Sequence, residues 1–170
     1  MEIKIDSPDP YNIPGEILTR GENVMMGYYK NESATQAVLE PDGWLHTGDM
    51  ATTDDIGTLF IRGRCKSMLL GSNGQNIYPE EIEARLNNMR CVMESLIVDR
   101  NGKLVALVVP DYEQADSEQI NHANLQEIMN DNLKELNAQV AAYERVAEIV
   151  LYPTEFEKTA KRSIKRYLYQ

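Results

Sequence analysis

The chain has 170 residues, of which 42% are hydrophobic and 26% charged, a composition typical of folded globular proteins. Its formal net charge of -10 at pH 7 argues against non-specific binding to nucleic acid, which requires a basic surface. No apolar run is long enough for an integral membrane segment, and Cys65 and Cys91 lack the spacing of a disulfide framework or a zinc site. These features favour a reducing cytoplasm, with peripheral attachment to a membrane left open.

Residues 1–65 are predicted to be mostly β. A loop rich in turn residues, "SPDPYNIPGE", leads into the alternating strand "EILTRG". The segment "KNESATQAVL" favours a short helix capped by Asn31. The segment "TTDDIGTLFIRG" then indicates a hairpin that turns between Asp54 and Gly57.

The residue pattern changes from Lys66 onward, where predicted helices alternate with predicted strands. Pro79 is expected to begin a helix in "YPEEIEARLNNM", and Asn101-Gly102 is expected to join two strands across residues 91–110. Residues 117–140 fit one amphipathic helix that includes Ile120 and Leu136. The strand "RVAEIVLYP" and the basic tail "KTAKRSIKRYLYQ" follow. This order predicts an α+β lobe with helices packed on a small sheet.

Asp49 in the first half, and the pair of Arg64 and Lys66 at its end, could carry chemistry. Asp49 in "GWLHTGD" follows a Thr-Gly turn at the end of a strand, where a carboxylate can accept hydrogen bonds from paired hydroxyls. Arg64 could fork onto phosphate or ribose oxygens, and Lys66 would add a flexible charge. Taken alone, each has a plainer interpretation, namely a turn aspartate that bonds its own backbone and two solvated surface charges.

Two further candidates lie in the second half. The loop "GSNGQN" carries Gly71 and Gly74, whose amides could approach an anion, although no Lys-Ser/Thr pair follows as in a phosphate loop. A mobile hairpin loop is the plainer alternative. The basic tail could likewise be the charged end of a helix, which complements the helix dipole without any catalytic role.

Three motifs in a fixed order decide between these interpretations. They are "GEILTRGENVMMGYYKNESATQAVLEPDGWLHTGD", "GRCKSMLLGSNGQNIYPEEIE" and "FEKTAKRSIKR". Together they resemble the C-terminal part of the AMP-forming acyl-CoA synthetases of the adenylate-forming superfamily, most closely the bacterial long-chain fatty-acid–CoA ligases. The resemblance implies that residues 1–65 are the last β-rich subdomain of an N-terminal adenylation domain. Residues 66–170 would be the mobile C-terminal domain.

The resemblance also implies a reaction in two steps. A carboxylate attacks the α-phosphate of Mg-ATP to give acyl-AMP, and the thiol of CoA then displaces AMP after the C-terminal domain has rotated. Asp49 and Arg64 would hold the nucleotide, and Lys66 would be the hinge. Gly74 would lie in the loop that enters the active site for thioester formation. The Mg²⁺ would be bound mainly by the larger domain, and no metal ligand is expected in this chain.

The tail departs from the Thr-x-x-Gly-Lys pattern that carries the catalytic lysine in this family. Counting four residues from Thr159 lands on Ser163, which cannot supply the positive charge. When the segment "SIKR" is placed on the Lys-x-Lys-Arg ending of the fatty-acid ligases, the resemblance puts Lys165 at the catalytic position, with Lys161 as the reserve. A second departure is Ser67, where relatives carry an acidic residue after the hinge.

The larger domain of the family is not recognisable in these 170 residues. The chain is therefore expected to be a fragment of a longer ligase, with the N-terminal domain of the same polypeptide as its partner and a fatty acid and CoA as substrates. Alone it is expected to be inactive. Two alternatives stay open at this point: a stand-alone interaction module without catalysis, and an adenylating enzyme that loads a carrier protein.

Overall fold

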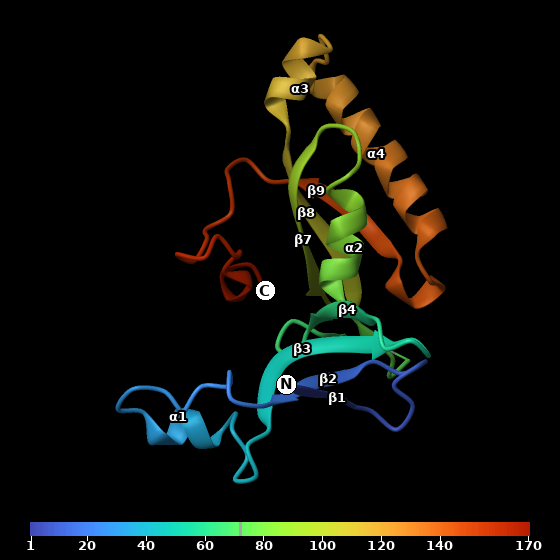
Figure 1. Ribbon diagram of the computed structural model, residues 1–170. Helices are drawn as coiled ribbons and strands as arrows, with labels where there is room; N and C mark the ends of the chain where they lie inside the picture. Colours follow the sequence, from blue (N-terminus) through green and yellow to red (C-terminus); the bar gives the residue numbers. More distant parts are fainter. Residues whose placement is uncertain (72) are drawn as a thin grey trace. The chain divides into compact units, whose positions relative to one another are not determined.

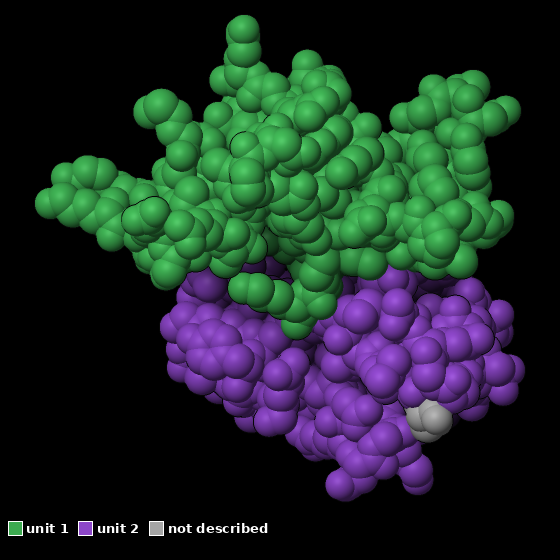
Figure 2. Space-filling model, turned by 90° about the horizontal axis from the view of Figure 1, so that it is seen from below, with its two compact units in different colours: residues 1–66 green, residues 67–170 purple. Residues whose placement is uncertain are grey.

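The structure is a computed structural model that describes residues 1–71 and 73–170 (Figure 1). The chain divides into two compact units, Met1–Lys66 and Ser67–Gln170 (Figure 2). The mixed α+β class predicted from the sequence is confirmed. The assignment of the two parts to an adenylation domain and a mobile domain stays a prediction.

The first unit is one antiparallel sheet with a short helix beside it. The sheet has the order β1-β2-β3-β4. Its elements are β1 (Glu2–Asp6), β2 (Gly15–Arg20), α1 (Glu32–Gln36), β3 (Leu45–Thr53) and β4 (Leu59–Arg64). Leu18 and Ala51 are fully buried, whereas every residue of β1 keeps some exposure, as is usual for an edge strand.

Local sequence signals in this unit form the expected structures. Asn31 caps α1 by accepting a hydrogen bond from the Ala34 amide at 3.1 Å. The hairpin between β3 and β4 turns at Asp54, whose carboxylate accepts hydrogen bonds from the amides of Ile56 at 3.2 Å and Thr58 at 2.7 Å. Both predictions are confirmed.

In its described residues, the second unit contains a three-stranded sheet, a two-stranded ribbon, three α-helices and two short 3-10 helices. Its elements are β5 (Leu69–Leu70), β6 (Asn76–Ile77), α2 (Pro79–Leu86), β7 (Val92–Arg100), β8 (Lys103–Pro110), α3 (Tyr112–Ser117), α4 (His122–Gln139), η1 (Ala142–Glu144), β9 (Val146–Leu151) and η2 (Arg166–Leu168). The main sheet has the order β7-β8-β9, with β7 antiparallel and β9 parallel to β8. The expected turn at Asn101-Gly102 is confirmed, because both residues have the positive φ that such a tight turn requires, 57° and 75°.

Side chains of this sheet alternate between two hydrophobic layers. Ile97 and Ala106 face the helices, where Met129 and Leu136 of α4 complete one core. The alternate residues face the tail, where Phe156 caps a second cluster formed by Leu96, Val98, Val105, Leu107 and Val109. Because successive side chains of a strand point to opposite faces, a single sheet serves both layers. The sheet is thus covered by helices on one face and by the C-terminal tail on the other (Figure 1).

One predicted helix boundary in this unit was wrong, and one alternative interpretation is not supported. The helix expected over residues 117–140 forms as α4 over His122–Gln139 and starts later than predicted, so Ile120 lies in the segment between α3 and α4. The break has a local cause: Gln119 adopts a positive φ of 56°, and Asn121 caps α4 through the Asn124 amide at 2.9 Å. The tail is also not a helix end, since its helical structure is the single turn η2.

Among the described residues, no helix is both long and apolar enough to cross a membrane. Within the same part of the chain, no group of three or more His, Cys, Asp or Glu side chains could hold a metal ion.

Candidate functional site

Asp49 and Arg64 are brought together by the pairing of β3 with β4. The two residues are direct partners across the ladder, and the Arg64 guanidinium donates a hydrogen bond to the Asp49 carboxylate. Their side chains keep 34% (Asp49) and 58% (Arg64) of their exposure, so the ion pair contributes little to stability. A ligand with hydroxyl or phosphate groups can therefore compete for both side chains at small cost.

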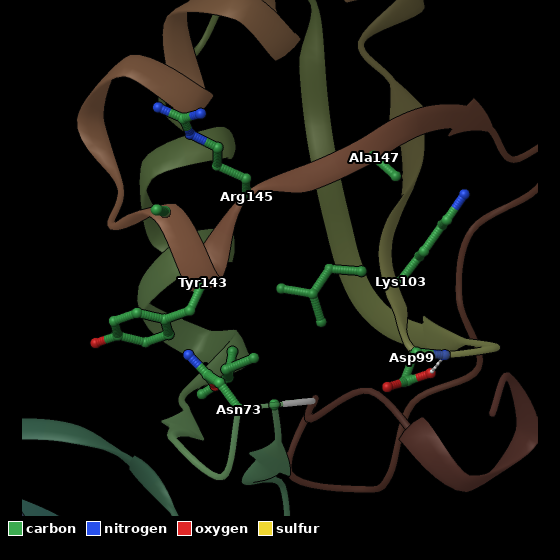
Figure 3. A pocket seen from close by; sticks show the side chains of 11 residues that line it. Asn73, Asp99, Lys103, Tyr143, Arg145 and Ala147 are labelled. Carbon is green, nitrogen blue, oxygen red and sulfur yellow. Dashed lines mark hydrogen bonds between the residues drawn. The ribbon is translucent and has the colours of Figure 1, made fainter.

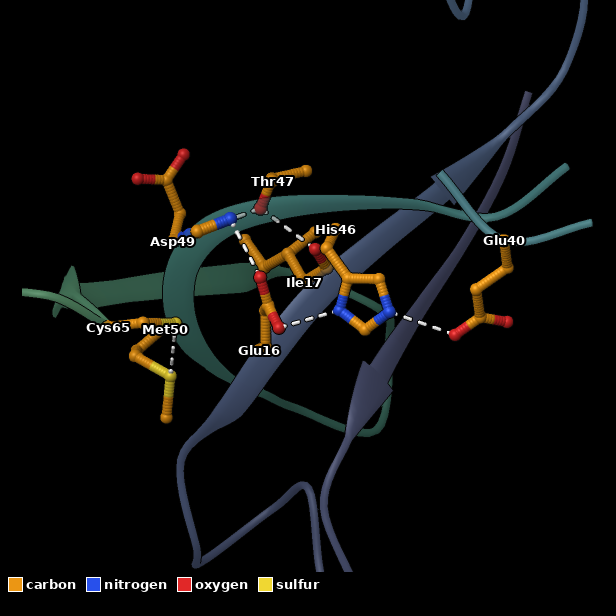
Figure 4. Close-up of polar contacts among 9 residues, drawn as sticks. Glu16, Ile17, Glu40, His46, Thr47, Asp49, Met50 and Cys65 are labelled. Carbon is orange, nitrogen blue, oxygen red and sulfur yellow. Dashed lines mark hydrogen bonds and ion pairs between the residues drawn. The ribbon is translucent and has the colours of Figure 1, made fainter. Parts of the chain in front are cut away.

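The backbone before Asp49 is held by its neighbours on β2. Gly48 has a φ of 76°, a conformation that other residues rarely adopt, and its amide donates to Glu16 Oε1 at 2.8 Å (Figure 4). The Thr47 hydroxyl donates to the Ile17 carbonyl and accepts from the Asp49 amide, at 2.8 and 3.1 Å. The Thr-Gly-Asp turn is thus fixed by hydrogen bonds on both sides of its glycine.

His46 bridges two carboxylates next to this turn. Its Nδ1 lies 2.8 Å from Glu16 Oε2, and its Nε2 lies 2.8 Å from Glu40 Oε1 (Figure 4). The hydrogen bonds to Glu16 and then to Glu40 raise the pKa of His46 above its usual value. The protonated imidazole therefore ties β3 to both β2 and the segment after α1.

This bridge predicts a loss of stability as the pH rises above the ordinary histidine pKa of 6.5. A folded-state pKa above the ordinary histidine value of 6.5 means that the stabilisation is complete below pH 6.5 and declines as the pH rises through the folded value. We expect deprotonation of His46 to lower the free energy of unfolding by roughly 1 kcal/mol. Chemical denaturation at several pH values measures it.

Glu40→Gln supplies the matched variant for that measurement, because it removes one of the two charges that act on His46 while keeping a hydrogen-bonding group. It should reduce the decline with pH, and His46→Gln should abolish this contribution. An unchanged decline in His46→Gln would contradict the assignment.

An open pocket of about 350 Å³ lies beside these residues in the first unit. Its lining comprises Glu16, Tyr28, Ala37, Val38, His46, Thr47, Gly48, Arg64, Cys65 and Lys66. The nucleotide candidate Arg64 and the hinge candidate Lys66 therefore share one cavity. Lys66 is also the last residue of the first unit, and Ser67 begins the second.

The second unit has a separate pocket of about 360 Å³ (Figure 3). Three segments form it: the loop before β6, the β7–β8 turn, and the segment from η1 into β9. The described lining includes the cations Lys103 and Arg145, the aromatic residue Tyr143, and Asp99, whose carboxylate accepts a hydrogen bond from the Gly102 amide at 2.8 Å. Two of the lining residues are cations and one is aromatic, and these residue types bind anionic and planar groups.

Gly71 and Asn73 of the glycine loop line the same pocket. The Gly74 amide donates to the Gly71 carbonyl at 2.8 Å. Gly74 itself has a φ of 79° and open space where a side chain would begin, so its backbone conformation is what calls for glycine. Ser72 of the predicted "GSNGQN" loop lies outside the described residues.

The tail places the two candidate lysines at different points of one hairpin-like loop. Lys165 is at the base, where its amide donates to the Glu157 carbonyl at 2.8 Å and its Nζ lies 3.1 Å from Glu157 Oε2. That hydrogen bond raises the pKa of Lys165. Lys161 is near the tip, beside Arg162 with its φ of 62°. Neither lysine is among the described residues that line the two pockets.

Sequence reasoning missed the residues that support these candidates, namely Glu16, Glu40 and His46 in the first unit and Glu83 and Arg166 in the second. One signal was available for Glu83. It falls on the same helical stripe as Pro79 and Leu86, and an acidic residue on an apolar stripe indicates a buried partner.

Residues 66–169 match the family model described as AMP-binding enzyme C-terminal domain. The chain is 40% identical to the 2-succinylbenzoate–CoA ligase of Bacillus cytotoxicus over 65% of its length, and 34% identical to 4-coumarate–CoA ligase 1 of Solanum tuberosum over 90%. It spans 24% and 28% of those two relatives. Among solved structures, the anthranilate CoA ligase AuaEII in complex with anthranoyl-AMP is 26% identical with a TM-score of 0.79, over 98% of this chain and 31% of that one.

Proposed function

This chain belongs to the AMP-binding enzyme C-terminal domain family, and from that premise we propose that it is the C-terminal part of an AMP-forming CoA ligase. In the first step a carboxylate oxygen attacks the α-phosphorus of ATP, and the bond to pyrophosphate breaks. In the second step the sulfur of CoA attacks the acyl carbon, AMP leaves, and the thiol proton passes to solvent. The residues of this chain would act in both steps.

The observation that carries the proposal is the exposed pair of Asp49 and Arg64 next to the ordered Thr-Gly turn. A carboxylate can accept hydrogen bonds from two ribose hydroxyls, and a guanidinium can donate to ribose or phosphate oxygens. Both side chains are held at adjacent places on β3 and β4, so they can bind one nucleoside without rearrangement of the backbone.

We assign Lys165 to the adenylation step, with Lys161 in reserve, and Lys66 to the pivot between the two steps. A lysine near the reacting carboxylate and α-phosphate would neutralise the negative charge that builds up between them. Gly74 would belong to the loop that admits the pantetheine arm of CoA. Support for Gly74 comes from its positive φ and from the pocket that the adjacent Gly71 and Asn73 help to line.

That pocket is our candidate for the nucleotide end of CoA, whose phosphates would meet Lys103 and Arg145 and whose adenine would lie against Tyr143. Arg145→Glu or Lys103→Glu should raise the KM for CoA about tenfold, because a hydrogen bond to a charged group is lost and a repulsion is added. The rate of acyl-AMP formation should not change. Steady-state kinetics with CoA as the varied substrate gives the answer.

Lys134→Glu is the control for these two variants, since Lys134 is an exposed residue of α4 that pairs with Asp131. It reverses a charge in the same unit and should leave the KM for CoA as it was. An equal rise in all three variants would reduce the effect to overall charge and contradict the pocket assignment.

Relatives named for 2-succinylbenzoate, 4-coumarate and anthranilate differ widely in their acids. We propose a fatty acid first, because the three motifs taken together most closely resemble those of the bacterial fatty-acid–CoA ligases. A panel of fatty, aromatic and dicarboxylic acids, assayed by acid-dependent ATP–pyrophosphate exchange, identifies the class. Exchange with none of them would count against an adenylating enzyme.

The native polypeptide that carries these residues is the right material for that assay. Immunoblotting of the source cells with antiserum against this chain gives its size. A band well above 19.3 kDa supports a complete ligase. A band at 19.3 kDa would favour the interaction module instead. Replacing CoA with a carrier protein in the assay would test the alternative that the enzyme loads a carrier protein.

A further inference from the structure

A buried ion pair joins helix α2 to the C-terminal tail. The Glu83 side chain is 9% exposed and the Arg166 side chain 19%, although both are charged. The Arg166 guanidinium donates to Glu83 Oε2, and it also lies 3.7 Å from Glu80 Oε1. Charged side chains are seldom buried without a specific partner, so this pair calls for an explanation.

Glu83 uses both of its oxygens. Oε1 accepts the amide of Ile97 at 2.7 Å, and Oε2 accepts from Arg166. Ile97 lies on β7, the edge strand of the main sheet, where alternate amides point away from the neighbouring strand. Arg166 arrives with the tail, which covers the opposite face of the sheet from α2. The ion pair therefore links the two layers around the sheet edge.

The negative charge of Glu83 is energetically costly in this buried environment unless a cation pairs with it. Burial raises the pKa of the Glu83 carboxyl, and the charge of Arg166 and the hydrogen bond from Ile97 oppose that rise. If Arg166 were removed, the carboxylate would stay buried with one hydrogen bond and the nearby charge of Glu80. The helix thus holds a site whose charge is balanced only when the tail is in place.

Arg166 directly follows the hairpin-like loop of residues 157–165. Glu157 and Lys165 close the base of this loop, Lys158 and Ile164 pair next to them, and the Thr159 amide donates to the Ser163 carbonyl at 2.8 Å. These bonds set the shape of the loop. Apart from its packing against the second hydrophobic cluster, the loop is tied to the lobe through Arg166 and through Lys158, which lies 2.8 Å from Glu94.

We propose that Glu83 and Arg166 are positioning residues, whose ion pair fixes the place at which the tail loop presents its lysines. The glycine loop that contains Gly74 leads into β6, and α2 follows β6 directly. The same contact would therefore hold the glycine loop and the tail loop of this lobe in one arrangement. The inference rests on the proposed function for the role of the lysines, but the anchoring of the loop does not.

The kinetic test uses Arg166→Met and Glu83→Gln in the native polypeptide. We expect kcat for acyl-AMP formation to fall about 30-fold with little change in the KM for ATP, since a displaced lysine affects the reacting centre rather than the binding of the nucleotide. Thioester formation from preformed acyl-AMP should change less than about threefold. Arg166→Lys should restore part of the rate, and the double variant should be no worse than Arg166→Met.

Arg90→Met is the matched control, because it breaks an arginine–glutamate pair with Glu118 in the same unit whose two side chains keep 54% and 32% of their exposure. It should leave both half-reactions unchanged. If Arg166→Met fails to fold, Glu83→Gln gives the same answer, since its amide oxygen can still accept the Ile97 hydrogen bond.

Hydrogen exchange on the unliganded protein provides a readout without catalysis. In Arg166→Met and Glu83→Gln, the amides of Thr159, Arg162 and Lys165 should exchange about tenfold faster, while α4 and β8 keep their protection. Unchanged exchange in this loop, or full adenylation in both variants, would overturn the inference. If exchange is faster in Arg166→Met and Glu83→Gln while Lys165→Ala and Lys161→Ala keep full activity, the anchoring of the loop is supported. Only the role proposed for the lysines is then rejected.

Discussion

Replacing Lys165 with alanine in the native polypeptide should lower the rate of acyl-AMP formation by about 100- to 1,000-fold, the cost of removing one electrostatic contact to the reacting centre. Thioester formation from preformed acyl-AMP should stay within about threefold of the wild-type rate, because in the proposed role the lysine acts before CoA binds. The Lys165 ammonium pairs with Glu157 across 3.1 Å, and the two side chains are 31% and 66% exposed. A phosphate group can displace such an exposed carboxylate at little cost.

Lys161→Ala decides between the two tail lysines. With Lys165 at the reacting centre, the alanine variant of Lys161 should adenylate normally. The positive φ of Arg162 sits where the Thr-x-x-Gly-Lys pattern has glycine, which leaves Ser163 at the usual lysine position. If adding Ser163→Lys to the Lys165→Ala variant restores acyl-AMP formation, a lysine at either position can reach the reacting centre. Full activity in both alanine variants would reject both lysines.

Much of the fold could be predicted because its signals are local. The Asn31 cap, the Asn101-Gly102 turn and the proline-started helix α2 depend on a few adjacent residues, and each forms as expected. Strand β1 gave no comparable signal, since it is an exposed edge strand whose stability comes from pairing with β2. The break between α3 and α4 was missed because the apolar spacing continues through Ile120, while Gln119 leaves the helical conformation.

The candidate site was predictable where a short motif sets it and not where distant segments meet. The sequence pointed to Asp49 and Arg64 as residues of interest, but their contact depends on the register of β3 with β4. The ion pair of Glu83 with Arg166 spans 83 positions of the chain, and no periodicity within either segment encodes its partner. Helical spacing indicates that Glu83 faces inward, yet only the tertiary structure identifies the cation that meets it.

Replacing Lys66 with proline should have the opposite effect to the change at Lys165. We expect acyl-AMP formation to continue near its normal rate and thioester formation to fall on the order of 100-fold, because proline fixes φ at position 66 and restricts the residue before it. The chain passes from one compact unit to the other at this residue, and a rotation between the two steps needs free backbone dihedral angles there. Rapid-quench measurement of each half-reaction separates the two rates.

Lys66→Ala separates the backbone from the side chain in this experiment. Alanine removes the ammonium group but leaves both dihedral angles free, so a pure pivot should tolerate it in both half-reactions. Loss of thioester formation in Lys66→Ala as well would mean that the charge of Lys66, which lines the pocket beside Arg64, contributes to the chemistry. Equal losses in both half-reactions for Lys66→Pro and Lys165→Ala would contradict both roles, since a pivot and an adenylation lysine must act at different steps.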